Sequence, residues 1–441
     1  MHFLYSFALS ILFVLLLPYF IFQAFKHGKY FANFKERLGH LPDSINDNNR
    51  PTLWIHTVSV GEFNAARPLI ERIRQAFPNY RLVVSTTTIT GQKLARAEYP
   101  HKLDRVFYFP FDWKFSVRRA LNSIRPAAVI ILETELWPNF LRECKNRGIV
   151  SIIVNGRISP RSFSRYSRIG GFISGVLNDV SLLIMQSEAD AERVRRLGAD
   201  DLRIQVCGNL KYDVTVRSQE SGVRSQELNE QFHLSSSKHL LVAGSTAPDE
   251  EKILLQAFNQ VRQHNGLEDT RLLIAPRHPE RFNEVASLLA DSKFTFARRS
   301  EKESAAPQNV DVILLDTIGE LTAAYEFAGV VFVGGSLVPK GGHNIIEPAA
   351  FAKPILVGSH TENFRQIISD FAHADAIVQI RAKEDDSAQA FAQQVIYLLT
   401  ENEQAQAMGK RALDILLKNR GAADCALAAI QKILSDANVK Q

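Results

Sequence analysis

The sequence is poor in cysteine and carries little net charge for its length. Its 441 residues include 3 cysteines, Cys144, Cys207 and Cys425, whose isolated positions form no spacing typical of a metal site or a disulfide framework. Scattered cysteines favour a reducing compartment over an oxidising one. The net charge of +5 does not indicate a nucleic-acid partner. What remains is a globular chain with 46% hydrophobic residues, long enough for two buried domains and an additional segment.

The chain opens with an apolar run at residues 3–25, which is nearly uncharged and rich in Leu, Ile and Phe. The run is about long enough to cross a bilayer as one helix, with a kink at Pro18. Basic residues follow it directly, which by the positive-inside rule places the body of the protein in the cytoplasm; they are Lys26, Lys29, Lys35 and Arg37. We predict a transmembrane anchor at residues 1–25 and a basic juxtamembrane segment at residues 26–50.

The apolar run has two other interpretations. A cleaved signal peptide would need an A-x-A-like site after the run and positive charges before it, and the sequence has neither. A buried helix of the globular fold is the remaining alternative.

Residues 51–213 alternate short apolar runs with stretches of helical periodicity. Such alternation is typical of a parallel, doubly wound sheet, whose ligands bind at the carboxyl ends of the strands. We predict an α/β, Rossmann-like domain with strands at residues 51–60, 81–87, 105–109, 127–132, 149–154 and 182–185.

A second alternating region covers residues 239–416 and predicts a second Rossmann-like domain, with strands at 239–246, 271–276, 310–316, 330–333 and 354–358. Between the two regions, residues 214–238 contain the pentapeptide VRSQE twice, without apolar periodicity. This composition predicts a flexible linker. The last residues, 417–441, predict a C-terminal helix.

A glycine-rich stretch follows the strand predicted at residues 330–333. It reads GGSLVPKGGHNIIEP, and its four glycines indicate a loop whose backbone approaches another group closely. Asn344 is placed as an N-cap with Glu347 three residues later, so that first-turn amides would face the loop and could hold an anion. The pattern predicts a nucleotide-phosphate site, and an ordinary capping box is the alternative.

Acidic residues gather at strand ends in the first domain. Glu62 follows a strand end at Gly61 and begins a helix, whose dipole would keep the carboxylate ionised at neutral pH. Glu133 and Glu135 follow the strand predicted at residues 127–132. An ionised carboxylate can take the proton of an attacking hydroxyl, so Glu62 is the candidate base and Glu135 the second candidate. The alternative is that these residues only stabilise helix dipoles.

A basic and aromatic stripe follows the fifth predicted strand. On a helix, Arg161, Arg165 and Arg168 would share one face, with Phe163 and Tyr166 among them. Such a patch behind a membrane segment suits an anionic lipid head group. A solvated charged face is the alternative.

Several motifs, in order along the chain, resemble those of the 3-deoxy-D-manno-octulosonic acid (Kdo) transferases of lipopolysaccharide biosynthesis. The motifs are SVGE, ETELWPN, NGRIS, IQVCGNLKYD, APRHPERF and GGHNIIEPAAF, and the resemblance runs from Trp54 to Phe364. Gly156 stands where the family has a slightly larger small residue, and Ala247 stands where it usually has a His that follows Gly-Ser-Thr.

The resemblance implies the glycosyltransferase-B fold, with two Rossmann-like domains facing across a cleft, an acceptor domain at 51–213 and a donor domain at 239–416. It implies an inverting transfer of Kdo from CMP-Kdo to a lipid A precursor (lipid IVA) at the cytoplasmic face of the inner membrane, without metal or cofactor. In this chain the matching residues would be Glu62 as the base; Ser59, Glu133, Glu135, Arg157 and Arg161 in acceptor binding or support; and Lys211, Gly244, Ser245, Thr246, Arg277, His278, Gly341, Gly342, His343, Asn344 and Glu347 at the donor.

Two rival functions share part of this pattern. Another membrane-associated glycosyltransferase-B enzyme that uses a UDP-sugar would share the glycine loop, but not SVGE together with ETELWPN. A non-catalytic, membrane-tethered binding protein would share the fold, and the presence of both acidic motifs argues against it.

Overall fold

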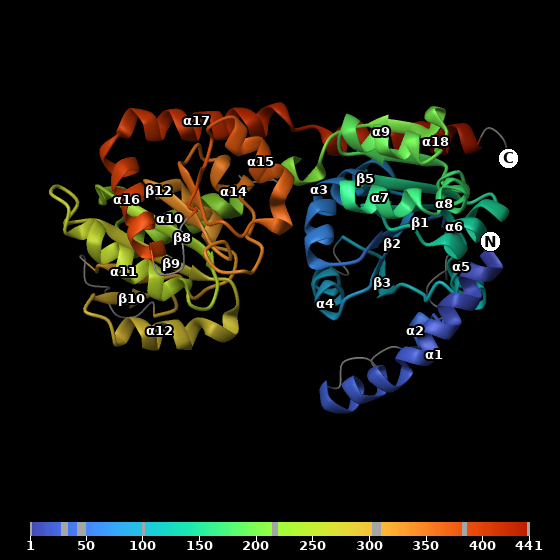
Figure 1. The fold of residues 1–441 in the computed structure, drawn as a ribbon, viewed down its shortest axis with the longest axis horizontal. Helices are drawn as coiled ribbons and strands as arrows, with labels where there is room; N and C mark the ends of the chain where they lie inside the picture. Colours follow the sequence, from blue (N-terminus) through green and yellow to red (C-terminus); the bar gives the residue numbers. More distant parts are fainter. Residues whose placement is uncertain are drawn as a thin grey trace. The chain divides into compact units, whose positions relative to one another are not determined.

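The computed structural model describes residues 2–27, 34–41, 50–98, 102–213, 219–301, 310–381 and 386–438. The chain divides into two compact units (Figure 1). Met1–Val214 and Asn419–Gln441 form the first, and Thr215–Lys418 forms the second. Each unit contains a seven-stranded sheet in which neighbouring strands pair in parallel. The α/β prediction is therefore confirmed.

The first sheet has the order β3-β2-β1-β4-β5-β6-β7. Its strands are β1 (Thr52–Thr57), β2 (Arg81–Thr86), β3 (Arg105–Tyr108), β4 (Pro126–Leu132), β5 (Val150–Gly156), β6 (Leu182–Met185) and β7 (Ile204–Val206). Its helices are α3 (Val60–Ala76), α4 (Ile89–Glu98), α5 (Lys114–Ile124), α6 (Pro138–Asn146), α7 (Pro160–Ser167), α8 (Gly170–Leu177), α9 (Glu188–Arg196) and α18 (Ala422–Asn438).

The central strands of this sheet, such as β1, β2 and β5, are buried on both faces, because side chains alternate between two apolar cores. On β1, Trp54 lies in the core that includes Val117 and Phe140 of α5 and α6. Its neighbour Leu53 lies in the core that includes Phe63 of α3 and Ile430 of α18. Both faces must be covered by helices, which explains the nearly continuous apolar runs in the sequence.

The second sheet has the order β10-β11-β9-β8-β12-β13-β14. Its strands are β8 (Leu240–Thr246), β9 (Arg271–Pro276), β10 (Phe296–Arg298), β11 (Val312–Leu314), β12 (Val330–Val333), β13 (Ile355–Val357) and β14 (Val378–Gln379). Its helices are α10 (Gln219–Phe232), α11 (Glu250–Arg262), α12 (Phe282–Ala290), α13 (Leu321–Ala324), α14 (Ile346–Ala349), α15 (Arg365–His373), α16 (Ser387–Thr400) and α17 (Asn402–Lys418).

The linker predicted at residues 214–238 is wrong for most of its length, because Gln219–Phe232 form the helix α10. Leu228 and Phe232 lie one turn apart and are buried in the second unit. Glu227 pairs with Arg299 at 2.9 Å. The two apolar anchors follow the polar repeat, and two such residues are too few to show a helical period in the sequence. Residues 214–218 lie outside the described part of the chain.

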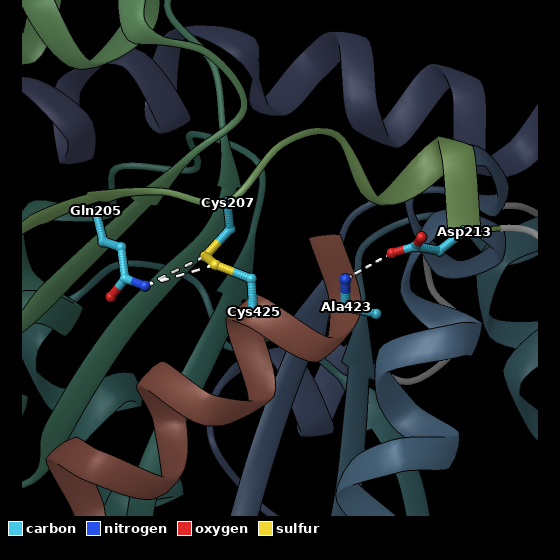
Figure 2. The surroundings of a disulfide bond; sticks show 5 residues. All are labelled: Gln205, Cys207, Asp213, Ala423 and Cys425. Atoms are coloured by element: carbon cyan, nitrogen blue, oxygen red, sulfur yellow. Dashed lines mark hydrogen bonds between the residues drawn. A yellow bond between two sulfur atoms is a disulfide. The ribbon is translucent and has the colours of Figure 1, made fainter. Parts of the chain in front are cut away.

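The chain returns to the first unit after Lys418, and a disulfide fixes the returning helix α18 (Figure 2). Cys207 and Cys425 are bonded, with Cα atoms 5.5 Å apart and a sequence separation of 218. The Asp213 carboxylate accepts hydrogen bonds from Gly421 N (2.7 Å) and Ala423 N (2.5 Å) at the start of α18. The cysteine spacing indicated no disulfide framework, and this bond was missed because residues so distant in sequence leave no spacing signal.

The N-terminal helix α1 (His2–His27) packs against the first unit. Phe13 meets Trp113 edge-to-face at 4.8 Å, and Asn139 Nδ2 donates a hydrogen bond of 2.9 Å to Ser6 Oγ. Within the described residues, none of the helices combines the length and apolarity that a membrane crossing requires. The transmembrane anchor predicted at residues 1–25 is thus not supported.

Candidate active site

The acidic residues of the first unit meet at the carboxyl edge of its sheet. Strand β1 ends at Thr57 and α3 begins at Val60, so Glu62 lies in the first turn of α3. Strand β4 pairs with β1 in parallel and ends at Leu132, directly before Glu133. Carboxyl ends of paired parallel strands share one edge, which brings the SVGE and ETELWPN motifs together.

The Glu62 carboxylate is held by its own loop. Its Oε2 accepts a hydrogen bond of 2.6 Å from Val58 N, and its Oε1 accepts one of 3.4 Å from Ser59 Oγ. Burial raises the pKa of Glu62 to about 7; these hydrogen bonds oppose the rise, and the charges of Glu133 and Glu135 add to it. We expected the helix dipole to keep Glu62 fully ionised at neutral pH. With its pKa raised by burial, the ionised Glu62 carboxylate binds a proton more strongly than an exposed glutamate does.

The loop after β4 carries the supporting groups. Glu133 has a φ of 55°, in the left-handed region. Lys211 Nζ lies 3.8 Å from Glu133 Oε1, so Lys211, predicted at the donor, lies beside the acidic groups of the first unit. The Thr134 hydroxyl bonds the backbone of Arg157 on both sides, accepting from its N at 2.7 Å and donating to its O at 2.5 Å. Burial, and then the charge of Glu133, raise the pKa of Glu135.

The basic stripe lies on α7, as its periodicity indicated. Ser159 caps this helix by accepting from Ser162 N at 3.1 Å. Arg161 and Arg165 are exposed on α7, and Arg168 is exposed directly after it. Their charges therefore face solvent, where an anionic surface could be met.

His56 is a residue beside this site that the sequence reasoning missed. It is fully buried on β1, its ring stacks on Phe109 at 3.9 Å, and its Nδ1 lies 3.0 Å from Ser85 Oγ. Burial lowers the pKa of His56 to about 3, so the imidazole is neutral. A histidine in an apolar strand just before SVGE was the available signal.

In the second unit, predicted donor residues on β8 shape the glycine-rich loop. Gly244 O accepts from Gly334 N at 2.8 Å. A Cβ at Gly334 would lie 2.5 Å from Ser245 O, so only glycine fits there. Thr246 Oγ1 donates to Glu251 Oε1 at 2.6 Å within the core. The Thr246 hydroxyl is therefore engaged internally.

The amides at the start of the glycine loop already bind a carboxylate of the chain. Glu250 is fully buried and accepts hydrogen bonds from the backbone N of Gly335 (2.7 Å), Ser336 (2.9 Å), Leu337 (2.9 Å) and Ala247 (2.8 Å). Burial raises the pKa of Glu250, and the amides oppose the rise. The prediction of an anion held at this loop is wrong for the amides of residues 335–337, since the Glu250 carboxylate already occupies the place of the phosphate there.

Three basic side chains lie together beside this loop. Arg277 and His278 follow β9 and are exposed. Burial lowers the pKa of His343 to about 4, and the charges of Arg277 and His278 lower it further. A Cβ at Gly335 would lie 2.9 Å from His343 Nε2, so His343 packs directly on the loop. The cluster offers one permanent positive charge, on Arg277, beside a neutral donor, His343.

Asn344 and Glu347 lie at a helix of only 4 residues, α14, which begins after Ile345. Asn344 is therefore not the N-cap that was predicted. Its Oδ1 accepts from Ile346 N at 3.1 Å, and its Nδ2 donates to Glu347 Oε1 at 3.3 Å. Thr322 Oγ1 donates to Glu347 Oε2 at 3.0 Å. A single turn of helix offers few free amides to a ligand.

Two glycines of the loop adopt a left-handed backbone. Gly341 and Gly342 have φ values of 87° and 74°, which other residues rarely adopt.

One exposed apolar residue of the second unit was not among the predicted site residues. Ile318 follows β11 and is 79% exposed at the carboxyl edge of the sheet. An exposed apolar side chain at a strand end is a candidate surface for a nucleobase.

Comparisons with known proteins agree with these motifs. A family model described as 3-Deoxy-D-manno-octulosonic-acid transferase (kdotransferase) matches residues 32–214. A 3-deoxy-D-manno-octulosonic acid transferase of Haemophilus influenzae is 35% identical over 386 residues, which cover 87% of each chain.

Solved structures show the same fold at low identity. A UDP-GlcNAc 2-epimerase from Neisseria meningitidis matches with a TM-score of 0.57 and 10% identity, covering 86% of this chain and 100% of that one. A glycosyltransferase from Rickettsia africae matches with a TM-score of 0.54 and 14% identity, covering 88% of this chain and 99% of that one. These structures show a glycosyltransferase-B-like fold. The 35% identity to the Haemophilus influenzae enzyme over 87% of each chain, together with the matching family model, shows that the chain belongs to the 3-deoxy-D-manno-octulosonic acid transferase family.

Proposed function

We propose that this protein transfers Kdo from CMP-Kdo to a hydroxyl group of a lipid A precursor at the cytoplasmic face of the inner membrane, with inversion and without a metal ion. The observation that carries the proposal is Glu62, a half-buried carboxylate with a pKa of about 7 beside Glu133 and Glu135. A group with a pKa near the working pH is suited to general base catalysis.

In the proposed reaction, Glu62 takes the proton of the acceptor hydroxyl as its oxygen attacks the anomeric carbon of Kdo. The bond from this carbon to the phosphate of CMP breaks as the new bond forms, through an oxocarbenium-like state. CMP leaves with the electron pair of the broken bond. Glu133 and Glu135 keep Glu62 basic, because their charges oppose its ionisation.

The donor phosphate is proposed to meet Arg277, His278 and His343. The amides of residues 335–337 are bound to Glu250, so these side chains are the available donors beside the loop. Glu347, with Asn344, is proposed to bind the ribose hydroxyls. The exposed face of Ile318 is proposed to contact the cytosine.

The purified protein should convert CMP-Kdo and a tetra-acylated lipid A precursor into a Kdo-lipid A product with release of CMP. Mass spectrometry of the lipid product tests this directly. Turnover with a UDP-sugar in place of CMP-Kdo would support the rival glycosyltransferase. Binding of both substrates without any product would support a binding protein.

Replacing Arg277 by Ala should weaken CMP binding by about 1.5–3 kcal/mol, which is roughly 10- to 150-fold in Kd, because one charge-assisted contact is lost. Isothermal titration measures this, with UDP as the comparison ligand. Lys293→Ala is the control, since Lys293 is exposed and precedes β10, at the other edge of the sheet. Equal affinity of the wild type for CMP and UDP would contradict the CMP assignment.

Membrane association is proposed to occur through α1 lying on the bilayer surface. One side of α1 packs on the first unit, and its other side exposes large apolar residues, among them Leu4 (66%), Phe7 (58%) and Leu15 (71%). Exposed arginines of α7 would add attraction to anionic lipids.

The double variant Phe7→Ser and Leu15→Ser should lower the affinity for anionic phospholipid vesicles at least about tenfold, since each side chain loses the transfer free energy of an apolar group. Flotation with vesicles measures the bound fraction. Leu202→Ser is the control, because Leu202 is 94% exposed in the same unit but lies outside α1. Unchanged flotation of the double variant would show that α1 does not touch lipid.

A further inference from the structure

The short segment 34–41 packs at the carboxyl end of β3, at the same edge of the sheet as the acidic motifs. Tyr108 N donates to Glu36 Oε2 at 3.0 Å, and Phe111 N donates to Arg37 O at 2.8 Å. Phe34 meets the Phe111 ring edge-to-face at 5.6 Å, and Leu41 is buried in the core of α5 and α6. The segment, which includes the one-turn helix α2 (Phe34–Arg37), is therefore a fixed part of this edge of the sheet.

The Arg37 guanidinium is held between an aromatic ring and a carbonyl oxygen. Its Cζ lies 4.5 Å from the centre of the Tyr108 ring, and its Nη2 donates to Thr87 O at 2.6 Å. A planar guanidinium can stack and donate at once, which a lysine ammonium cannot do as well. Arg37 thus ties the segment to the loop that follows β2.

That loop in turn holds the residue that binds Glu62. Thr87 N and Thr88 N both donate to Val58 O, at 3.2 and 3.0 Å. Val58 N donates to Glu62 Oε2 at 2.6 Å. A continuous series of contacts therefore runs from Arg37 through Thr87 and Val58 to the Glu62 carboxylate.

We propose that Arg37 is a positioning residue for Kdo transfer, which acts by holding the loops after β1 and β2 so that Val58 N stays bonded to Glu62. The inference rests on the proposed function, in which Glu62 is the base. Without this bond the ionised form of Glu62 would lose a stabilising donor, and the carboxylate would be a misplaced and more easily protonated base.

The other charged and titratable groups near Glu62 define what else can move its titration. Glu133 and Glu135 follow β4 and raise its pKa. Lys211 lies 3.8 Å from Glu133, and His56 on β1 is neutral. Arg37 is held by Thr87 O and by the Tyr108 ring, so the contributions of these four groups should persist when Arg37 is replaced.

The test is the pH dependence of kcat for Arg37→Ala and Arg37→Lys, measured on the full chain with CMP-Kdo and lipid acceptor. The acid limb, at about pH 7 in the wild type, should move up by about one pH unit in Arg37→Ala. The rate should therefore fall about five- to sixfold at pH 7 and recover almost fully at pH 9, with the KM for CMP-Kdo unchanged. The acid limb of Arg37→Lys should lie between those of the wild type and Arg37→Ala.

Arg96→Ala is the matched control. Arg96 is exposed on α4 and its charge also acts on Tyr108, but the hydrogen bond to Thr87 O comes from Arg37 and stays in place in this variant. Its acid limb should stay in place. A limb that does not move in either Arg37 variant, or a loss that is equal at all pH values, would overturn the inference. If Arg37→Ala does not fold, the limb of Arg37→Lys decides.

Failure of the base assignment would look different. If Glu62→Gln kept the wild-type rate and acid limb, the proposed function of Glu62 would be wrong whatever Arg37 does. If Glu62→Gln were inactive and the Arg37 limb unmoved, only the role of Arg37 would be wrong.

Discussion

Replacing Glu62 by Gln should lower kcat by about 100- to 10,000-fold, because the base that takes the acceptor proton is lost. CMP binding and the unfolding temperature should stay near wild-type values. The amide oxygen of Gln can still accept the hydrogen bond of 2.6 Å from Val58 N, so the loop keeps its structure. Turnover by mass spectrometry, titration with CMP and thermal unfolding measure the three quantities.

The pH profile gives a second measurement on the same residue. Glu62 acts in its ionised form, and burial raises its pKa to about 7, so kcat of the wild type should increase with pH through that value. At pH 6 about one tenth of the molecules would carry the base in its active form. The acid limb should disappear in the residual activity of Glu62→Gln.

Glu71→Gln is the matched control, since Glu71 lies on the same helix and pairs with Lys102 at the surface, at 2.8 Å. It should behave as the wild type. Near-normal turnover of Glu62→Gln, or a loss of stability together with activity, would show that Glu62 serves the start of the helix. The base would then be sought at Glu135, whose pKa is also raised by burial.

Replacing Glu250 by Ala should lower the free energy of unfolding of the second unit by about 3–5 kcal/mol and abolish CMP binding. The change removes the acceptor of four backbone amides, three of them in the glycine loop, which would remain buried and unpaired. The loop would lose the shape that places His343 against Gly335. Denaturant unfolding and titration with CMP measure both effects.

Asp249→Asn is the control, because the neighbouring Asp249 side chain is 75% exposed and Asn tolerates its φ of 76°. Glu250→Gln should be intermediate, since its amide keeps an oxygen acceptor but loses the charge. If Glu250→Ala unfolds like the wild type and still binds CMP, the loop holds its shape without this carboxylate.

The alternation of strands and helices could be predicted from the sequence, because it depends on interactions between residues close in the chain. Buried strands such as β1 and β8 are short apolar runs, and the helices between them show their own periodicity. Three edge strands, β7, β10 and β14, were missed, since none of their residues is fully buried and 2 or 3 residues carry no pattern.

The sequence predicted which residues lie at the candidate site, but not which groups they contact. Strand ends and motif order brought Glu62, Glu133 and Arg277 to the carboxyl edges of their sheets. Glu250 binds the loop amides, and Lys211 lies beside Glu133. Both contacts depend on which loops the fold brings together. The pKa of Glu62 likewise depends on carboxylates delivered by another strand.

The sequence by itself therefore determined the two α/β domains, the family and the acidic and glycine-rich motifs, because local periodicity and motif order are properties of the chain. Only the tertiary structure decided the disulfide between Cys207 and Cys425, the helix α10 in place of a linker, and the packing of α1. Each of these depends on partners far away in the sequence. Hydrophobicity shows how much apolar surface a segment has, whereas the fold decides which part of that surface the protein itself covers.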